Sequence, residues 1–417
     1  MASRRNFIKK GSITAIGLPW LSRSFENSGL RDPNGNIDWN EVRSHFPITS
    51  WEKIQMNSGS AGVMTNETRA HLVDLIHEMN SSAPYYAWGK WSEIKESNTE
   101  RLAKHIGANS SDISVVRNTT EALNMIIYGM RFEKGDRIVA AKHDYPHALS
   151  AVKNRAKKDG LDLVLVDMTL PASEDRILKT YEEVLNENAK LLLVTHMTHR
   201  EGFIMPVKKL ADMAHRNGAL VALDAAHSYG QFMHDIQDLG VDFYGTSLHK
   251  WLNAPHGNGL LYSKPESLDA LDIYPSASES ADKTIKQFEY LGTRSFAHEI
   301  GISSALDFYE ELGPQVKQKR LYELKTYWTE KASDIKGFEI HSDPSYEKSC
   351  AVATFSIKGL SNGLIRRSLD QDFGIHAKSV GGSFGGGIRI SPNIFTSYSE
   401  LDKLVEAIRN IARSNQK

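Results

Sequence analysis

The sequence predicts an α/β fold in which a large domain with a mostly parallel sheet precedes a smaller α+β domain. Three observations support this class. Short apolar runs alternate with helix-like stretches from about residue 110. These runs are apolar throughout, which is typical of parallel strands that helices cover on both faces. After about residue 300 the alternation stops, and shorter, mixed elements follow.

The elements before the alternating region are one short strand and two helices. The strand begins at Ile54 and runs into a loop of small residues at 57–59. Thr65 is expected to cap a helix that begins after it. Apolar residues recur downstream of this cap at the i, i+3, i+4, i+7 spacing of a helix: Leu72, Leu75, Ile76 and Met79. A second helix is expected over 93–106.

The alternating region divides into strands and helices by its apolar periodicity. Strands are expected at 113–116, 137–141, 161–166, 191–195, 220–224, 241–246 and 259–262. Helices are expected at 121–130, 147–158, 174–186 and 207–216. Gly218 ends the last of these, because glycine readily adopts the left-handed conformation at a helix C-terminus. Ligands of such sheets bind beyond the carboxyl ends of the strands, so residues that follow strands are the candidates for chemistry.

The C-terminal region predicts the smaller domain. Its expected elements are a strand at 351–357, a helix at 362–369, a strand at 388–390 and a closing amphipathic helix at 397–412. We therefore divide the chain into a signal and linker over 1–35, a large domain over 36–300 and a small domain over 301–417. The N-terminal segment 36–60 is expected to pack with the small domain.

The composition limits the function. Lys+Arg number 50 and Asp+Glu 51, for a formal net charge of −1, so the chain lacks the basic excess typical of nucleic-acid or membrane-surface binding. Cys350 is the single cysteine, which excludes an internal disulfide framework and a multi-cysteine metal site. No apolar run reaches the roughly 18 residues of a membrane span, so none is expected.

The first residues resemble an export signal. Residues 3–9 read Ser-Arg-Arg-Asn-Phe-Ile-Lys, close to the twin-arginine motif S-R-R-x-F-L-K, and a weakly apolar stretch follows over 11–21. Such a signal is an address and not part of the fold. The twin-arginine route carries folded proteins, which suits a protein that takes up a cofactor before it leaves the cytoplasm. We expect export to the periplasm; the alternative is a basic tail on a cytoplasmic protein.

Two neighbouring strands end in residues that suit one cofactor. The strand at 220–224 ends at Asp224, and the strand at 241–246 is followed by Ser247, His249 and Lys250. Pyridoxal 5′-phosphate (PLP) requires a lysine amine for a Schiff base and a carboxylate that faces its pyridinium nitrogen. The sequence therefore predicts a PLP site with Lys250 and Asp224 as its catalytic pair.

Other residues would complete the cofactor site. Thr119 and Thr120 lie between a strand and a helix, where exposed backbone amides bind anions such as a phosphate. Ser247 and His249 flank the lysine and could also reach that phosphate. His227 follows Asp224 by three residues and could donate to the phenolic oxygen of the ring.

Two more candidates concern the ring and the substrate. Tyr145 offers a flat apolar surface that could stack on the pyridine; a buried core tyrosine is the alternative. Arg389 follows a glycine-rich loop at 381–387 and would clamp a substrate carboxylate through its two-pronged donor geometry. A surface ion pair is the alternative for this arginine.

Together these residues resemble the class V aminotransferase family of fold-type I PLP-dependent enzymes, in particular its isopenicillin N epimerase-like and cysteine desulfurase/selenocysteine lyase-like branches. The likeness runs from about Met56 to the C-terminus. It implies a seven-stranded type of sheet between helices, a homodimer with active sites at the interface and an amino-acid-type substrate. Matching motifs place Thr119, Thr120, Ser247 and His249 at the phosphate, Tyr145 on the ring, Asp224 at the pyridinium, His227 at the phenolic oxygen and Lys250 at the covalent bond.

The resemblance also assigns residues on the substrate side and across the interface. Thr293, after Gly292, resembles the family segment that reaches the phosphate of the neighbouring subunit. Arg389 matches the carboxylate-binding arginine, and Asn57 is placed with it on the substrate side. His199 stands where family members often carry asparagine beside the cofactor, a difference that could alter the reaction.

One departure separates the chain from the desulfurase branch. That branch requires a cysteine nucleophile in a loop before the last strand, and residues 374–379 contain none. Cys350 is expected to be a small buried residue. Three reactions stay open: amino-group transfer, epimerisation or racemisation, and elimination by a C–S lyase that has no cysteine nucleophile.

Three other classes compete with this interpretation. Ser383 fits the motif G-x-S-x-G, but neither the helix nor the later histidine of a serine hydrolase follows it. His196 with His199, and His143 with His147, have metal-ligand spacings, but no carboxylate motif accompanies them, and we expect no metal. A non-catalytic ligand-binding protein on the same fold would usually carry an added DNA-binding module, and the near-neutral chain shows no such basic module.

Overall fold

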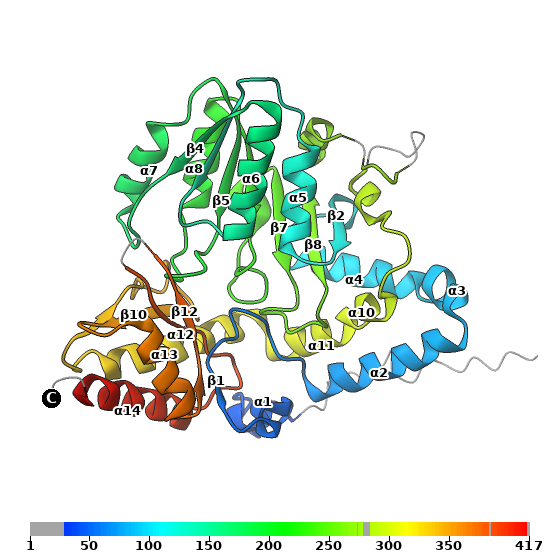
Figure 1. Ribbon diagram of the computed structural model, residues 1–417. Helices are drawn as coiled ribbons and strands as arrows, with labels where there is room; N and C mark the ends of the chain where they lie inside the picture. Colours follow the sequence, from blue (N-terminus) through cyan, green and yellow to red (C-terminus); the bar gives the residue numbers. More distant parts are fainter. Residues whose placement is uncertain (1–28, 273, 278–283, 383–384, 415–417) are drawn as a thin grey trace, which may run out of the picture.

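A sheet of seven strands lies at the centre of the structure, a computed structural model that describes residues 29–272, 274–277, 284–382 and 385–414 (Figure 1). Its strand order is β2-β8-β7-β6-β5-β3-β4. The strands are β2 (Ile113–Val116), β3 (Arg137–Ala141), β4 (Asp162–Val166), β5 (Ala189–Thr195), β6 (Leu220–Asp224), β7 (Phe243–Ser247) and β8 (Gly259–Ser263). β8 is antiparallel to its two neighbours, and every other pair is parallel. The predicted α/β class with a mostly parallel sheet is confirmed.

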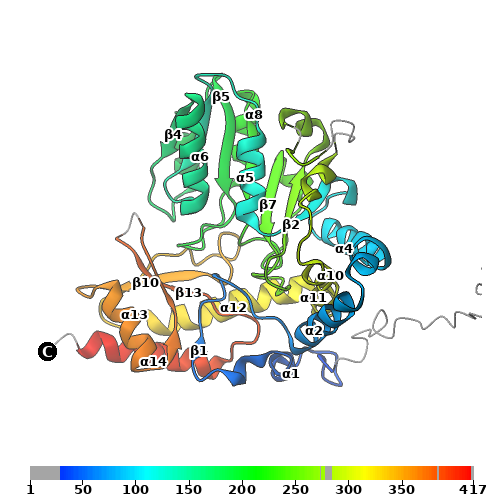
Figure 2. The ribbon, with the colours of Figure 1, turned by 45° about the vertical axis from the view of Figure 1, so that its right-hand side comes forward.

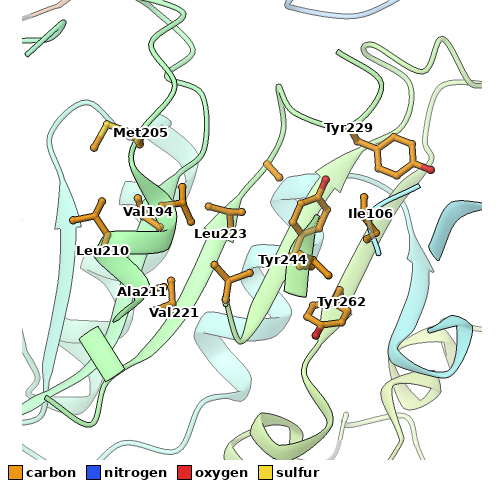
Figure 3. Close-up of a cluster of buried hydrophobic side chains, with 14 of the residues drawn as sticks. Ile106, Val194, Met205, Leu210, Ala211, Val221, Leu223, Tyr229, Tyr244 and Tyr262 are labelled. Atoms are coloured by element: carbon orange, nitrogen blue, oxygen red, sulfur yellow. The ribbon is translucent and has the colours of Figure 1, made fainter. Parts of the chain in front are cut away.

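Helices cover both faces of this sheet, α5 and α6 on one side and α7 and α8 on the other (Figures 1 and 2). The helices are α5 (Thr119–Gly129), α6 (Pro146–Asp159), α7 (Glu174–Glu182), α8 (Val207–Arg216) and the short α9 (Ile236–Leu239). Figure 3 shows one core cluster, in which Val221 and Leu223 of β6 lie near Leu210 and Ala211 of α8. Ala222, between them in sequence, belongs to the cluster on the other face. Burial on both faces explains the uninterrupted apolar runs.

A group of helices comes from two parts of the chain, residues 39–104 and 296–312. It contains α1 (Trp39–Ser44), α2 (Asn66–Ser81), α3 (Ala83–Tyr85), α4 (Ser92–Lys104), α10 (Phe296–Ile300) and α11 (Ile302–Leu312). Thr65 caps α2 as predicted, because its hydroxyl accepts a hydrogen bond from the amide of Thr68 at 3.1 Å. The remaining single-turn segments are η3 (Pro47–Ser50), η4 (Tyr86–Lys90), η5 (Ser110–Asp112), η6 (Pro265–Ala270) and η7 (Ile285–Glu289).

A second, antiparallel sheet lies beyond one edge of the large sheet, in the order β12-β13-β10-β9 (Figure 1). Its strands are β9 (Phe338–Ile340), β10 (Ala353–Ile357), β12 (Lys378–Val380) and β13 (Gly387–Ile390), and its helices are α12 (Pro314–Ala332), α13 (Asn362–Gln371) and α14 (Tyr398–Ser414). β1 (Ile54–Gln55) pairs in parallel with β11 (Ile375–His376), so the N-terminal segment lies against this region. The predicted boundary at 300–301 falls between α10 and α11.

Some predicted bounds need correction. The helix expected at 174–186 ends at Glu182, because Glu183 forms the C-cap and the following turn carries Leu185 into the core. The strand expected at 241–246 begins at Phe243, since the carboxylate of Asp242 already accepts the amide of Val221 at 2.7 Å. None of the helices in the described ranges has both the length and the apolar character needed to cross a membrane.

Candidate active site

The ends of β6 and β7 bring two predicted residues to one edge of the large sheet. Parallel pairing sets Asp224 opposite Thr195 of β5 and Gly245 of β7. β7 ends at Ser247, two residues after Gly245. The chain then turns into the loop that carries Lys250. This edge faces the smaller sheet in both views (Figures 1 and 2), so the site lies between the two regions.

Asp224 and Lys250 are coupled electrostatically. Asp224 is buried, and its carboxylate accepts a hydrogen bond from the amide of Ala226 at 3.0 Å. Burial raises the pKa of Asp224, against that hydrogen bond and the positive charge of Lys250. Burial also lowers the pKa of Lys250 to about 8, against the charge of Asp224 and with help from Arg389 and Lys378. An amine with this pKa is partly neutral at pH 7 and can act as a nucleophile or base.

The N-terminus of α5 forms an anion site. Asn118 caps the helix, and its side-chain oxygen accepts the amide of Glu121 at 2.9 Å. Thr119 donates its amide to the Ser247 hydroxyl at 3.0 Å, and the two hydroxyl oxygens are 2.7 Å apart. Thr120 follows in the same first turn, so its amide faces the same end. A phosphate here would find hydroxyl donors and a helix dipole worth about 0.3–1 kcal/mol.

His249 lies beside this anion site in a defined protonation state. Its Nδ1 is 3.2 Å from the carbonyl oxygen of Asn258, which can only accept, so Nδ1 carries the proton. Burial lowers the pKa of His249 to about 4, and the charge of Lys250 adds to this effect. The neutral ring therefore offers a lone pair at Nε2. It would donate to a phosphate only after protonation, which the phosphate's own charge favours.

His227, His199 and Tyr145 lie around the same centre. Burial lowers the pKa of His227 and of His199 well below the usual value, and the positive charge of Lys250 contributes to both shifts. The His199 ring packs edge-on against Tyr145, with centroids 5.5 Å apart. Tyr145 is 36% exposed, so it is not a core tyrosine. The structure therefore gathers these three predicted side chains near the lysine.

Arg389 reaches the site from β13 of the smaller sheet and is 2% exposed. Its Nη2 donates to Asn57 Oδ1 and to the Ser60 hydroxyl, both at 3.0 Å, and its Nη1 donates to the carbonyl oxygen of His199 at 2.9 Å. Three of the five guanidinium N–H groups are thus used to fix the side chain. The Nε has no partner among the described residues. The two N–H groups left over, Nε–H and one on Nη1, point to different sides of the guanidinium. A two-pronged contact with a carboxylate would therefore need Nη2 to release Asn57 or Ser60.

Two residues near the site, Lys378 and Gly62, were not predicted from the sequence. Lys378 is the cross-strand partner of Arg389, so both side chains leave the same face of the sheet. Gly62 presses against the lysine loop, and its amide donates to the carbonyl oxygen of His249 at 2.9 Å. Strand register could have revealed Lys378, but nothing local marks Gly62.

One predicted residue does not join this centre. Thr293 lines a separate cavity of about 640 Å³, together with Arg117, Tyr274, Tyr290 and Arg294 among others. This cavity lies beside η7 and α10 and holds none of Asp224, Lys250 or Arg389.

The structure also bears on the competing classes. Cys350 is buried, and its Sγ lies 3.6 Å from the carbonyl oxygen of Gln231. Burial raises the pKa of Cys350 to about 12, so its thiol is unsuited to nucleophilic attack.

Within the described ranges, no three or more His, Cys, Asp or Glu side chains are grouped to bind a metal ion. Ser383, the serine hydrolase candidate, and the export motif at 3–9 lie outside the described residues.

The residues present fit PLP. A carboxylate, an amine and a helix N-terminus with two hydroxyls supply the partners of the ring nitrogen, the aldehyde and the phosphate. Buried polar atoms without partners in the described part of the chain include both ring nitrogens of His143, Nδ1 of His199 and Nε of Arg389. Unpaired buried polar atoms are costly, and two of these atoms belong to residues in direct contact, His199 and Arg389, which is consistent with a polar molecule bound beside them.

Comparison with known proteins agrees with this geometry. A sequence model of the family described as Aminotransferase class-V matches residues 54–404. The isopenicillin N epimerase of Streptomyces clavuligerus is 26% identical over 397 residues, which cover 89% of this chain and 98% of that protein. The cysteine desulfurase of Haloferax volcanii is 26% identical over 415 residues, covering 89% and 96%.

A solved structure shares the fold. The apo structure of the cysteine desulfurase from Thermococcus onnurineus superposes with a TM-score of 0.78 at 23% identity. The match covers 90% of this chain and 98% of that one. The similarity therefore extends over both the large sheet and the smaller sheet.

Proposed function

The chain belongs to the class-V aminotransferase family, and on that premise we propose that it is a PLP-dependent enzyme acting on an amino acid or an amino-acid derivative through Lys250. The observation that carries the proposal is the Lys250 amine, whose pKa is lowered to about 8 while it interacts with the buried Asp224. An ordinary surface lysine would have neither the shift nor the partner.

When bound, PLP supplies an electron sink that stabilises negative charge at the α-carbon of the substrate. The side chains of this protein position that chemistry. Asp224 would hold a proton at the pyridine nitrogen, and the helix N-terminus at Thr119 would bind the phosphate. Arg389 would hold the substrate carboxylate through the fork of Nε and Nη2, once Nη2 releases Asn57 or Ser60. The Lys250 amine would take up the proton from the α-carbon and return it.

The choice of reaction follows from what the site lacks. A protein-bound persulfide needs an accessible thiolate, and Cys350 is buried with its pKa raised to about 12. We therefore place amino-group transfer first, because it needs no protein thiol and Lys250 alone can carry the proton away from the α-carbon. Epimerisation is the second candidate, since the Streptomyces epimerase aligns over 98% of its length. A C–S lyase without a cysteine nucleophile is the third.

A substrate panel tests these reactions. The purified holoenzyme is incubated with L- and D-amino acids in D₂O, and keto acid, product chirality, sulfide and deuterium at the α-carbon are measured. Keto acid without sulfide indicates transfer, keto acid with sulfide indicates a C–S lyase, and inverted product with deuterium indicates epimerisation. Arg389→Lys should raise KM for carboxylate substrates at least about tenfold, because lysine lacks the forked donors. If no amino acid exchanges its α-proton, the proposal is wrong.

We also propose a homodimer, in which Thr293 serves the phosphate site of the partner subunit. Its support is the position of Thr293 in a cavity away from Lys250. Large exposed aromatic side chains lie nearby: Trp88 is 64% exposed and packs edge-on against Phe296, with centroids 5.4 Å apart. Exposed aromatic side chains beside a polar cavity are typical of protein interfaces.

Export by the twin-arginine route is a further proposal, supported by residues 3–9. Fractionation of cells that express the full chain tests it. Replacement of Arg4 and Arg5 by lysine should retain the folded protein in the cytoplasm. Unchanged distribution of this double variant would contradict export by that route.

A further inference from the structure

Trp251, the residue after the proposed cofactor lysine, makes a directional contact with His227. Its indole is fully buried, and Nε1 lies 3.2 Å from Nδ1 of the histidine. An indole nitrogen can only donate, so Nδ1 must accept. Burial, with the charge of Lys250, holds the pKa of His227 well below its usual value, so the ring is neutral. A neutral ring that accepts at Nδ1 carries its single proton on Nε2.

We infer that Trp251 is a positioning residue that fixes His227 in the Nε2–H tautomer, so that this nitrogen donates a hydrogen bond to the phenolic oxygen of the cofactor. This inference rests on the proposed function, which places His227 against that oxygen. The opposite tautomer would present a lone pair at Nε2, and two acceptors would then face each other. Trp251 itself would not touch the cofactor.

Close contacts hold the backbone of the loop that carries Trp251. The backbone carbonyl oxygen of Trp251 accepts a hydrogen bond from the buried amine of Lys317. This amine also donates to Asn253 Oδ1 at 3.2 Å. Gly230, in the turn that follows the histidine, permits the close approach of this loop. A Cβ at position 230 would lie 2.9 Å from the carbonyl carbon of Trp251. The turn that contains Gly230 therefore packs closely against the loop that contains Trp251, which keeps the indole within hydrogen-bonding distance of His227.

The first experiment uses the cofactor-free protein, so it does not depend on the proposed function. Nitrogen-15 NMR of histidine-labelled protein reports which ring nitrogen carries the proton, and His227→Gln identifies the signal. Trp251→Phe removes the N–H and keeps an aromatic ring. Trp328→Phe is the matched control, because Trp328 is equally buried and its Nε1 has no partner among the described residues.

The wild type and Trp328→Phe should show His227 as the Nε2–H tautomer. In Trp251→Phe the ratio should shift toward Nδ1–H by about threefold to tenfold, the effect of losing one buried hydrogen bond. A wild-type spectrum with the proton on Nδ1 would overturn the inference even if Trp251→Phe failed to fold. An unchanged ratio in folded Trp251→Phe would overturn it too.

The second experiment tests the consequence at the cofactor. Trp251→Phe should lower kcat/KM several-fold and shift the absorbance of the bound cofactor, whereas Trp328→Phe should change neither. In the His227→Gln background, Trp251→Phe should have no further effect, because a glutamine amide always offers a donor. An equal effect of Trp251→Phe in both backgrounds would show that the indole acts only through packing and would refute the tautomer role.

Discussion

At the scale of single residues, burial shifts the reactivity of the lysine and the cysteine in opposite directions. Burial favours the neutral form of any ionisable group. For Lys250 the neutral form is the nucleophile, and the pKa lowered to about 8 makes the amine more reactive. For Cys350 the neutral form is the inert thiol, and the pKa raised to about 12 makes the sulfur less reactive. The same physical effect thus favours lysine chemistry over persulfide chemistry.

The lysine pKa predicts the pH dependence of cofactor uptake. Only the neutral amine attacks the aldehyde, so the rate of uptake by the apoprotein should rise about tenfold per pH unit while the pH is below the pKa. With a pKa of about 8 instead of 10.5, the rate should level off above pH 8. Stopped-flow absorbance measures this rate. A rate that still rises steeply beyond pH 9 would mean that Lys250 is an ordinary lysine.

Removal of the cysteine should leave catalysis intact. Cys350→Ala deletes a buried sulfur that packs in an apolar cluster and makes only weak contacts with the carbonyl oxygens of Gln231 and Gln318. Turnover should therefore stay within about twofold, and stability should fall by about 1 kcal/mol. Steady-state kinetics and chemical denaturation measure the two effects. Loss of turnover in a variant with near-wild-type stability would restore the persulfide mechanism that we exclude.

At the scale of elements, the 57–63 loop packs closely through Gly62 against the loop that carries Lys250. A Cβ at position 62 would lie 2.0 Å from the carbonyl oxygen of Lys250, closer than any real contact. Gly62→Ala should therefore cost about 1–3 kcal/mol of stability and weaken PLP binding, because the lysine loop must move. Chemical denaturation and cofactor titration measure both.

Gly363→Ala is the matched control for this substitution. Position 363 lies in α13, and an added Cβ there meets nothing within 4 Å. The control should leave PLP affinity unchanged and stabilise the protein by up to about 1 kcal/mol, because alanine favours helix. If the two variants behave alike, the 57–63 loop does not support the lysine.

The elements of the large sheet could be predicted from the sequence because most of its strands are short, mainly apolar runs that are buried on both faces. The end of β6 at Asp224 and the cap at Thr65 needed only local patterns. The end of α7 at Glu182 and the start of β7 at Phe243 could not be predicted, because Leu185 and the Asp242 carboxylate act through tertiary contacts. Local periodicity carries no information about such contacts.

The contacts between the site residues were harder to predict than the residues themselves. Lys250, Asp224 and Arg389 were identified by type and order along the chain. The hydrogen bond from Arg389 to Asn57 joins residues 332 positions apart, which the pairing of β1 with β11 and the bridge between Asn57 and Ser391 bring together. The cross-strand position of Lys378 and the close packing of Gly62 against the loop that carries Lys250 likewise depend on the assembled fold.

At the scale of the whole molecule, the proposed dimer can be tested at its exposed aromatic surface. Trp88→Glu places a charge beside Phe296, so it should dissociate the dimer and weaken PLP binding at least about tenfold. Sedimentation velocity should give twice the 46.6 kDa of the chain for the wild type. Leu364→Glu, an exposed apolar position on α13, is the control and should remain dimeric. A monomeric, fully active wild type would contradict the role of Thr293.

The most direct test of the whole account is the site of covalent attachment. The holoprotein is reduced with borohydride and digested, and the peptides are mapped by mass spectrometry. The account predicts the mass of the reduced cofactor on the peptide that contains Lys250, and no label and no near-visible absorbance band in a folded Lys250→Ala variant. A label on a different lysine, or an absorbance band that persists in Lys250→Ala, would contradict it.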